Sequence, residues 1–473
     1  MPHEPLRLLG FSLVMLGLAC APAEREPRLN LVVVNVDTLR ADHLPFYGYA
    51  RDTAPFLGGL AKESLVFEAA RANSSFTRES VASLLTGRLP SRVGRSGWNA
   101  APLVGNHLGP LLRQAGYRTA FLSNTVMLKH PGFTQGFDLV QHLPARWDLS
   151  GAGPKLTARA LAFLDAGEEP FGLYLHYLDP HAPYAPSAEQ LARLGARPTP
   201  EPLLLYDDVL PRLAPLLDAG FGPGEPRYEN LVSRYDAEIA EVDAALAALF
   251  AGLEERGLSD RTLVVVTADH GEEFLEHGYL EHGWTLYEEV LRVPLLLWAP
   301  RHLAAARVSA PVSQIDLLPT LATLLGLPAD GDDFDGAPLV ERGEAMWRAA
   351  PPARPQIAEL LIGRRSVLRS VVQDGWKYVA IHRDVPAEAR EARDAAGPSQ
   401  EPWPRAPVRE QLFQLEVDPE EQRDVLAEHP ERAAALARSL PTLPAQPTAP
   451  PAPEPAAPLS EVERERLRKL GYL

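Results

Sequence analysis

The chain has 473 residues and a formal net charge of −16, an acidic balance that argues against a surface binding nucleic acid or anionic lipid directly. Hydrophobic residues make up 46% of the chain, which is enough for a large core and excludes a wholly disordered protein. The single cysteine, Cys20, excludes intramolecular disulfides, iron–sulfur clusters and zinc sites held by cysteine.

The N-terminal segment has the pattern of an export signal. Arg7 precedes an apolar run, Leu8 to Ala19, that is shorter than the roughly 20 residues of a membrane-spanning helix. The run leads into Cys20, and residues 16–20 (LGLAC) resemble a bacterial lipoprotein signal, although Gly17 stands where an aliphatic residue is usual. We therefore expect residues 1–20 to be a lipoprotein signal peptide ending at Cys20, which is lipidated and anchors the protein outside the cytoplasm, in the periplasm or at the outer surface of a bacterial envelope. Ordinary secretion with an incidental Cys20 is the alternative.

From Leu31 onward, strand and helix patterns alternate. Continuous apolar runs at Leu31–Val36, Phe171–Leu178, Leu263–Thr267 and Leu295–Trp298 are typical of strands buried on both faces. A helical repeat of apolar residues covers Tyr228–Glu255. This order predicts an α/β fold with a large, mainly parallel or mixed sheet flanked by helices, followed by a smaller α+β domain.

Two of the predicted strands end in acidic residues. Asp37 follows the first strand, and Asp269-His270 follows the strand at 263–267. Because ligand sites of parallel sheets form at the carboxyl ends of the strands, these residues are candidate ligands of one metal ion. The alternative is that the acids only cap the helices that follow.

The C-terminal part divides by composition. We expect a catalytic domain over residues 29–344 and a small domain over 345–440, which contains a loose insertion at 385–407 rich in Ala, Pro and charge. Residues 441–459 form a Pro-rich tether, since eight prolines fall within 441–458, and residues 460–473 have the pattern of a short terminal helix.

The segment Ser75–Arg88 (SFTRESVASLLTGR) resembles the nucleophile segment of the sulfatases, within the alkaline phosphatase superfamily. Further segments are similar to family signatures in the family's order, namely Leu178–Tyr184, Leu286–Glu289 with Arg292–Pro294, Asp316–Thr320, Leu412–Leu415 and Asp418-Pro419. The resemblance covers most of the mature chain and implies a sulfatase-like metallohydrolase. It implies that Asp37, Asp269 and His270 are metal ligands and that His181 belongs to a substrate-binding loop.

The chain departs from the sulfatase pattern at the nucleophile. Thr77 stands where a sulfatase has the Cys or Ser that is oxidised to formylglycine, and Glu79 and Val81 replace the Pro or Ala and the Arg of the maturation signal. We therefore expect no formylglycine. A threonine hydroxyl becomes a useful nucleophile when it is bound to a metal ion, so Thr77 is both a candidate ligand and the candidate nucleophile. Alternatively, Thr77 only caps an apparent helix at Val81–Leu85.

Three further residues are candidates for substrate contacts. Asn124 and Val126 lie near the positions of a Lys and a His of the sulfatase pocket, and Asn124 offers an amide N–H to a substrate oxygen or serves only in a local turn. His181 and His282 are candidate catalytic groups that contact the transferred group or protonate the leaving group. His277 competes with His282 for that role.

The ligand types bear on the metal. The sulfatase pattern suits calcium, but His270 stands where sulfatases usually have Asn, and an imidazole ligand favours manganese or zinc, with calcium still possible. A second ion would need further ligands, for which Asp179, His176 and His282 are the candidates. Their spacing does not match two-metal enzymes well, so one divalent ion is expected.

These observations predict a metal-dependent hydrolase of anionic esters, with phosphate or phosphonate esters favoured over sulfate esters. The expected substrate is a small anionic ester or a sulfated or phosphorylated glycan; the membrane is reached through the lipid anchor, and no nucleic acid partner is expected. Three alternatives remain: an arylsulfatase-type hydrolase, a transferase that moves a phospho-head group onto envelope glycans, and a non-catalytic glycan-binding relative. The sequence leaves the oligomeric state open.

Overall fold

The computed structural model describes residues 28–93, 105–125, 127–143, 152–167, 169–195, 215–362, 366–382, 407 and 409–442. The predicted signal peptide with Cys20, the insertion at 385–407 except residue 407, the tether from residue 443 onward and the terminal helix at 460–473 lie outside the described residues. Val126 lies outside them as well.

A sheet of eight strands, in the order β11-β2-β10-β7-β1-β6-β4-β5, forms the centre of the described chain. Its strands are β1 (Asn30–Val36), β2 (Leu65–Phe67), β4 (Arg118–Ser123), β5 (Leu139–His142), β6 (Phe171–Tyr177), β7 (Thr262–Ala268), β10 (Leu295–Trp298) and β11 (Ala306–Val308). The five strands from β7 to β5 pair in parallel, whereas β10 runs antiparallel to β7 and β2. Strands β1, β6 and β7 are buried along their whole length, as their continuous apolar runs require.

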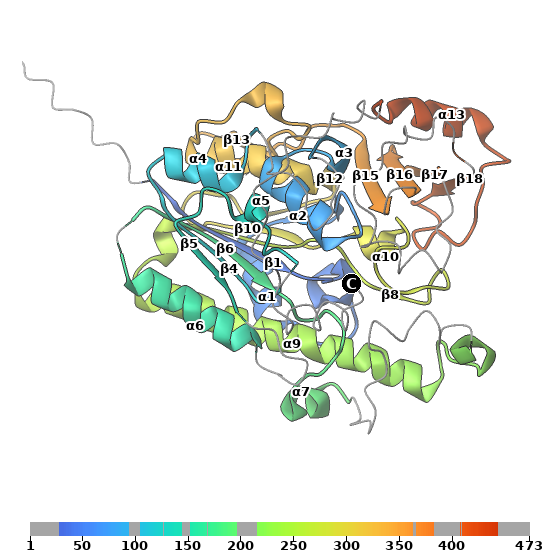
Figure 1. Ribbon diagram of the computed structural model, residues 1–473, viewed down its shortest axis with the longest axis horizontal. Coiled ribbons are helices and arrows are strands. Elements are labelled where there is room, and N and C mark those ends of the chain that lie inside the picture. Colours follow the sequence, from blue (N-terminus) through green and yellow to red (C-terminus); the bar gives the residue numbers. More distant parts are fainter. Residues whose placement is uncertain are drawn as a thin grey trace, which may run out of the picture.

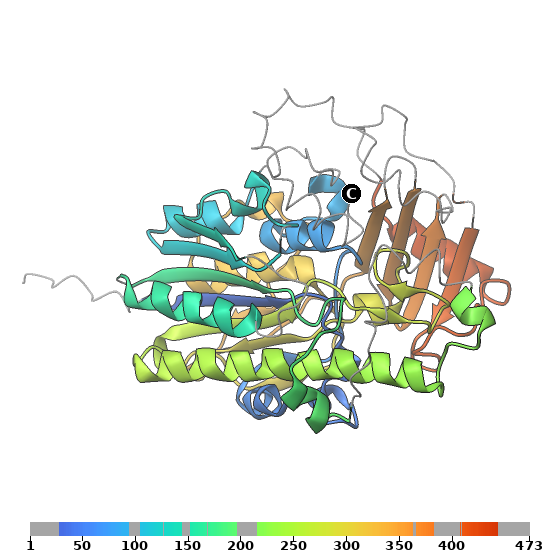
Figure 2. The ribbon, with the colours of Figure 1, turned by 60° about the horizontal axis from the view of Figure 1, so that its bottom comes forward.

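Helices cover both faces of this sheet (Figures 1 and 2). The longest, α9, lies with α6 on one face, while α2, α4 and α11 lie on the other. The helices are α1 (Pro55–Leu60), α2 (Thr77–Thr86), α3 (Pro90–Val93), α4 (Leu108–Gln114), α5 (Pro131–Thr134), α6 (Ala152–Asp165), α7 (Ala188–Arg193), α9 (Pro226–Glu255), α10 (Glu288–Leu291), α11 (Leu317–Leu325) and α13 (Pro430–Ser439). The predicted α/β fold class is therefore confirmed, and the predicted strands and the long helix differ from the observed ones by no more than two residues at an end.

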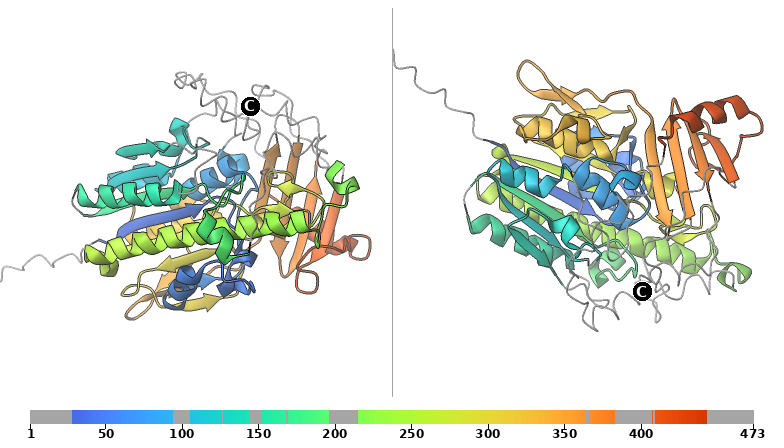
Figure 3. Two further views of the ribbon diagram at one scale, coloured as in Figure 1. Left: turned by 90° about the horizontal axis from the view of Figure 1, so that it is seen from below. Right: turned by 45° about the horizontal axis from the view of Figure 1, so that its top comes forward.

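A second, antiparallel sheet lies beside the main one (Figure 3). It contains β15 (Gln356–Ile362), β16 (Ser366–Gln373), β17 (Trp376–Ile381) and β18 (Arg409–Gln414) in that order, with α13 packed against it. Hydrogen bonds join β15 of this sheet to the segment around α2 and α3: Asn73 Nδ2 donates to Ile357 O at 2.7 Å, and Glu359 accepts a hydrogen bond from Ser91 N at 2.9 Å. This α+β part completes the predicted fold.

Three short strand pairs complete the described architecture. They contain β3 (Ala70–Arg71) with β12 (Val312–Ser313), β8 (Glu273–Phe274) with β9 (Leu280–Glu281), and β13 (Val340–Arg342) with β14 (Trp347–Ala349). The β8–β9 hairpin matters for the site because it follows the end of β7 directly. No helix among the described residues has the length and apolar character needed to cross a bilayer.

Candidate active site and metal centre

Three predicted ligands meet at the carboxyl edge of the main sheet. β1 and β7 are neighbouring parallel strands in which Val36 pairs with Ala268, so Asp37 and Asp269 leave the sheet side by side. Ligand atoms of Asp37, Asp269 and His270 all lie within 4.8 Å of one another, and the three side chains are buried. Within the described residues, this is the one group of three or more His, Cys, Asp or Glu side chains close enough to hold an ion.

The atoms of this cluster fit a cation. Asp37 Oδ1 and Asp269 Oδ2 are buried and have no hydrogen-bond partner in the described part of the chain. His270 Nδ1 donates to Gly271 O at 2.9 Å, which leaves Nε2 as a lone-pair donor, 3.5 Å from Asp269 Oδ2 and 3.9 Å from Asp37 Oδ1. Burial and the charge of Asp269 raise the pKa of Asp37 well above its usual range. Two unpaired carboxylate oxygens and an imidazole nitrogen are a donor set for a divalent ion such as manganese or zinc.

Thr77 lies at this cluster. Its Oγ1 is 3.2 Å from His270 Nε2, and the side chain is fully buried. Helix α2 begins at Thr77, with Phe76 at its N-cap, so the predicted start near Val81 is wrong by four residues and Thr77 is not the N-cap. In the first turn of α2, Ser80 Oγ donates to Asp269 O at 2.5 Å. That bond fixes the first turn of α2 against the strand end that carries two of the ligands.

His282 and His181 lie beside the metal-ligand cluster. The ring of His282 is 4.3 Å from the ring of His270 and 5.0 Å from that of His181, measured between centroids. His181 Nδ1 donates to Ala182 O at 2.6 Å, and burial lowers the pKa of His181 to about 4. The structure thus brings both predicted histidines to one place.

Glu272 and Tyr184 orient His282, and neither was singled out from the sequence. His282 Nδ1 lies 2.8 Å from Glu272 Oε1, and the Tyr184 hydroxyl donates to Glu272 Oε2 at 3.0 Å. Burial and the charge of Glu281 raise the pKa of Glu272 well above its usual range. Glu272 therefore retains a proton at higher pH than an exposed glutamate would.

Asn124 follows β4, next to the end of β6. Its Oδ1 accepts a hydrogen bond from Leu178 N at 2.6 Å, so its Nδ2 points away from this backbone group. Its Nδ2 is buried and unpaired with respect to the residues described. Asn124 thus combines a local backbone bond, as the turn interpretation expected, with an N–H group available to a ligand.

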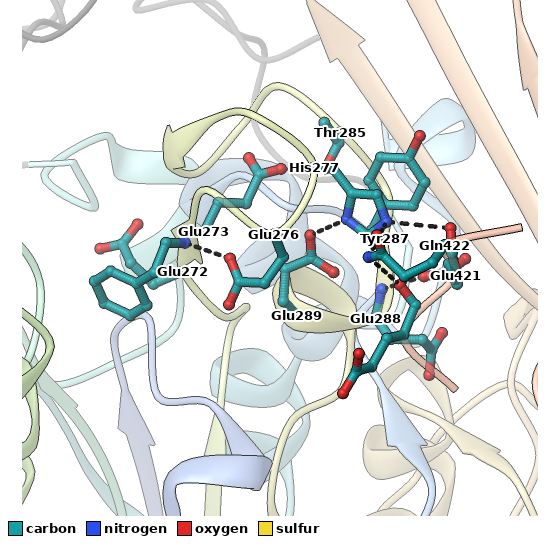
Figure 4. A network of polar contacts seen from close by, with 12 residues as sticks. Glu272, Glu273, Glu276, His277, Thr285, Tyr287, Glu288, Glu289, Glu421 and Gln422 are labelled. Carbon is teal, nitrogen blue, oxygen red and sulfur yellow. Dashed lines mark hydrogen bonds and ion pairs between the residues drawn. The ribbon is translucent and has the colours of Figure 1, made fainter. Parts of the chain in front are cut away.

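His277 belongs to a different network, between the loop after β8 and the second sheet (Figure 4). Its Nδ1 bonds to Glu289 Oε1 at 2.6 Å, its ring stacks on Tyr287 with centroids 3.6 Å apart, and its Nε2 lies 3.3 Å from Glu421 O. Burial lowers the pKa of His277, but the hydrogen bond and charge of Glu289 outweigh it and raise the value. Of the two competing histidines, His282 is the one at the ligand cluster.

The candidate ligands of a second ion do not come together. Among the described residues, His176, Asp179 and His282 form no group close enough to hold an ion. His176 Nε2 contacts Asp37 Oδ2 at 3.1 Å, His282 contacts Glu272, and burial together with the charge of Glu241 raises the pKa of Asp179 to about 7. Burial lowers the pKa of His176 to about 4, so this imidazole is neutral. The sequence made His176 a candidate ligand of a second ion, whereas in the structure it contacts Asp37, a candidate ligand of the first.

Comparisons with known proteins show similarity in sequence and in fold. A family model described as Sulfatase matches residues 29–327. An N-acetylglucosamine-6-O-sulfatase of Bacteroides thetaiotaomicron is 25% identical over 443 residues, covering 74% of this chain and 78% of that protein. The multifunctional alkaline phosphatase superfamily protein PehA of Trinickia caryophylli is 27% identical over 408 residues, covering 68% and 79%. Among solved structures, the phosphonate monoester hydrolase of Agrobacterium radiobacter superposes with a TM-score of 0.66 at 20% identity, covering 87% of this chain and 94% of that chain.

Proposed function

The chain belongs to the sulfatase family and is a hydrolase of anionic esters, and from this premise we propose that it cleaves phosphate or phosphonate esters with Thr77 as the nucleophile. The observation that carries the proposal is the position of Thr77 Oγ1, 3.2 Å from the His270 nitrogen that faces two unpaired carboxylates. A hydroxyl at that place can share a cation with the three ligands. A threonine that served only to begin a helix would not need to lie beside these three side chains.

Asp37, Asp269, His270 and Thr77 would hold one divalent ion. When bound, the ion supplies positive charge that lowers the pKa of the threonine hydroxyl and offsets the charge of the substrate. The residues of the chain do the rest of the positioning. The N-terminal end of α2, where the helix dipole is positive, and Asn124 Nδ2 would bind the non-bridging oxygens of the ester.

The reaction would proceed in two steps. Thr77 Oγ gives its proton to a water molecule and attacks phosphorus in line with the leaving group; the new P–O bond forms as the bond to the leaving oxygen breaks. His282, oriented by Glu272, gives a proton to that oxygen, and His181 lies beside it to contact the transferred group. Water then attacks the phosphothreonine, restores the threonine hydroxyl and releases phosphate or phosphonate.

The preference for phosphorus over sulfur rests on the nucleophile. Thr77 replaces the residue from which a sulfatase makes formylglycine, and the segment around it lacks the signal by which sulfatases are matured. The similarity in fold to a phosphonate monoester hydrolase is consistent with this choice. A sulfate ester is the second candidate, favoured by the sequence similarity to an N-acetylglucosamine-6-O-sulfatase, and a sulfated or phosphorylated glycan is then the substrate class.

The proposal has a direct test. The purified protein is assayed with nitrophenyl sulfate, phosphate monoester, phosphate diester and phosphonate monoester, each with and without Mn²⁺, Zn²⁺ or Ca²⁺, alongside Thr77→Ala. We expect a phosphorus ester to be turned over fastest, with Mn²⁺ or Zn²⁺ required and activity lost in Thr77→Ala. Turnover of the sulfate ester that survives in Thr77→Ala would refute the nucleophile assignment.

We also propose that the enzyme is anchored at a membrane surface through lipidated Cys20, outside the cytoplasm. The apolar run before this single cysteine supports the proposal. Expression in a bacterial host followed by membrane fractionation tests it: the wild type should enter the membrane fraction, and Cys20→Ala should not carry the lipid. An identical distribution and an identical N-terminal mass for the two forms would contradict it.

A further inference from the structure

We propose that His176, with its tautomer set by Asn35, is a positioning residue of the metal centre: its Nε2–H holds Asp37 so that one carboxylate oxygen is kept for the ion. The inference rests on the proposed function, because it assumes an ion at Asp37, Asp269 and His270. It gives His176, a residue of strand β6 that would not itself bind the ion, a role in metal affinity.

The sheet register places these residues together. Asn35 on β1 pairs with His176 on the neighbouring parallel strand β6. Register partners in adjacent strands project from the same face, and Asp37, two residues after Asn35, continues along that face. Asn35 and His176 are fully buried and Asp37 is 1% exposed. The three side chains therefore form a row that leads from the interior of the sheet to the metal-ligand cluster.

The donors around His176 fix its tautomer. Asn35 Nδ2 lies 3.1 Å from His176 Nδ1, and the Tyr174 hydroxyl lies 3.4 Å from the same atom. The Asn35 NH₂ group can only donate, so Nδ1 accepts, and the Tyr174 hydroxyl can donate to it as well. A neutral imidazole then has its single proton on Nε2, which donates to Asp37 Oδ2 at 3.1 Å. The opposite tautomer would place a nitrogen lone pair against a carboxylate oxygen with no hydrogen between them, which is repulsive.

The hydrogen bond from His176 gives the two oxygens of Asp37 different roles. Oδ2 is occupied by His176, whereas Oδ1 is unpaired among the described residues and lies 3.9 Å from His270 Nε2. A carboxylate held in this way has one orientation and loses little rotational freedom when an ion binds. Hydrogen-bond partners of metal ligands typically change metal affinity by about 10- to 100-fold. We expect an effect of that size from His176 and a smaller one from Asn35, which acts through it.

The experiment is a metal-binding titration that needs no substrate. Isothermal titration of the full purified chain with Mn²⁺ and with Zn²⁺ is compared for the wild type, His176→Ala, His176→Gln and Asn35→Ala. The Gln variant keeps an N–H donor near the position of Nε2. Asn30→Ala is the matched control, since Asn30 is a buried asparagine at the other end of β1 whose Oδ1 accepts from Phe171 N at 3.1 Å.

We expect His176→Ala to raise the dissociation constant by about 10- to 100-fold, His176→Gln to recover most of the affinity, and Asn30→Ala to bind as the wild type does. Should His176→Ala not fold, a weaker affinity in Asn35→Ala than in Asn30→Ala carries the same conclusion. Affinities of His176→Ala and Asn35→Ala equal to that of a wild type that binds metal would overturn this inference alone. A wild type that binds neither ion would overturn both this inference and the proposed function.

Discussion

The amide of Asn124 allows a substrate contact to be separated from a structural one. Its Oδ1 accepts from Leu178 N at 2.6 Å, while its buried Nδ2 has no partner within the described chain. Asn124→Asp keeps an oxygen acceptor for Leu178 N but replaces the free N–H₂ by an oxygen that repels an anionic ester. Asn124→Ala removes both functions.

The two variants should therefore differ in stability and agree in activity. Loss of a donor to charge that develops in the transition state costs about 10²- to 10³-fold in rate, so we expect kcat/KM of both variants to fall by at least that factor. Only Asn124→Ala leaves the buried Leu178 N–H without an acceptor, which costs about 1–3 kcal/mol of unfolding free energy. Asn124→Asp keeps that acceptor, and at about pH 5, where burial keeps its carboxyl protonated, it should unfold closer to the wild type than Asn124→Ala does.

The assay combines steady-state kinetics on the best nitrophenyl ester with urea unfolding of the same preparations. The wild type and Asn30→Ala serve as references, since Asn30 lies at the far end of β1. If Asn124→Asp kept its kcat/KM within about threefold of the wild type, Nδ2 would not touch the substrate and the reasoning from the unpaired amide would be refuted, because a lost donor to the transition state should cost about 10²-fold.

Three further predictions follow from the same geometry. Glu272→Ala, which frees the ring of His282, should slow esters with poor leaving groups more than nitrophenyl esters; an equal loss across a leaving-group series would contradict the orienting role. Removal of ions with a chelator should abolish turnover, and Mn²⁺ or Zn²⁺ should restore it more fully than Ca²⁺; full activity after exhaustive chelation would count against the metal centre. Burial lowers the pKa of His107 from 6.5 to about 3. As the pH falls below 6.5, this imidazole is therefore protonated in the unfolded chain but not in the folded one. Its contribution should lower the free energy of unfolding by about 2 kcal/mol between pH 6.5 and pH 5. His107→Asn, which keeps an acceptor for Gly109 N, should lose less stability over that range in urea unfolding, and an unchanged slope would contradict the assignment.

The sequence predicts well whatever depends on continuous apolar runs. Five of the six residues at 31–36 are aliphatic, which favours a buried strand, and the observed strand differs from this range by one residue. The acids at strand ends could be placed on one edge because parallel strands share their carboxyl side, which is a property of the fold class rather than of any pair of residues. The resemblance to the sulfatases then gave each of them an expected role.

Positions that depend on tertiary contacts were harder to predict. The start of α2 was placed at Val81 because residues 77–80 are polar; in the structure they are helical because they are buried and bonded to other segments, as Ser80 is to Asp269 O. Glu272 carried a signal, since it follows Asp269-His270-Gly271 directly, but its partner His282 is ten residues away across the β8–β9 hairpin. His176 lies in an apolar strand pattern, and only the register with Asn35 shows that it faces Asp37.

The most direct test of Thr77 as the nucleophile is its chemical state during turnover. The enzyme is mixed with excess phosphorus ester, quenched in acid within one turnover, digested and examined by high-resolution mass spectrometry, with Thr77→Ala as the control. We expect a phosphoryl or phosphonyl group on the peptide that carries Thr77 and none in the variant. An active wild type with unmodified Thr77 under these conditions, together with a Thr77→Ala variant of comparable activity, would contradict this assignment.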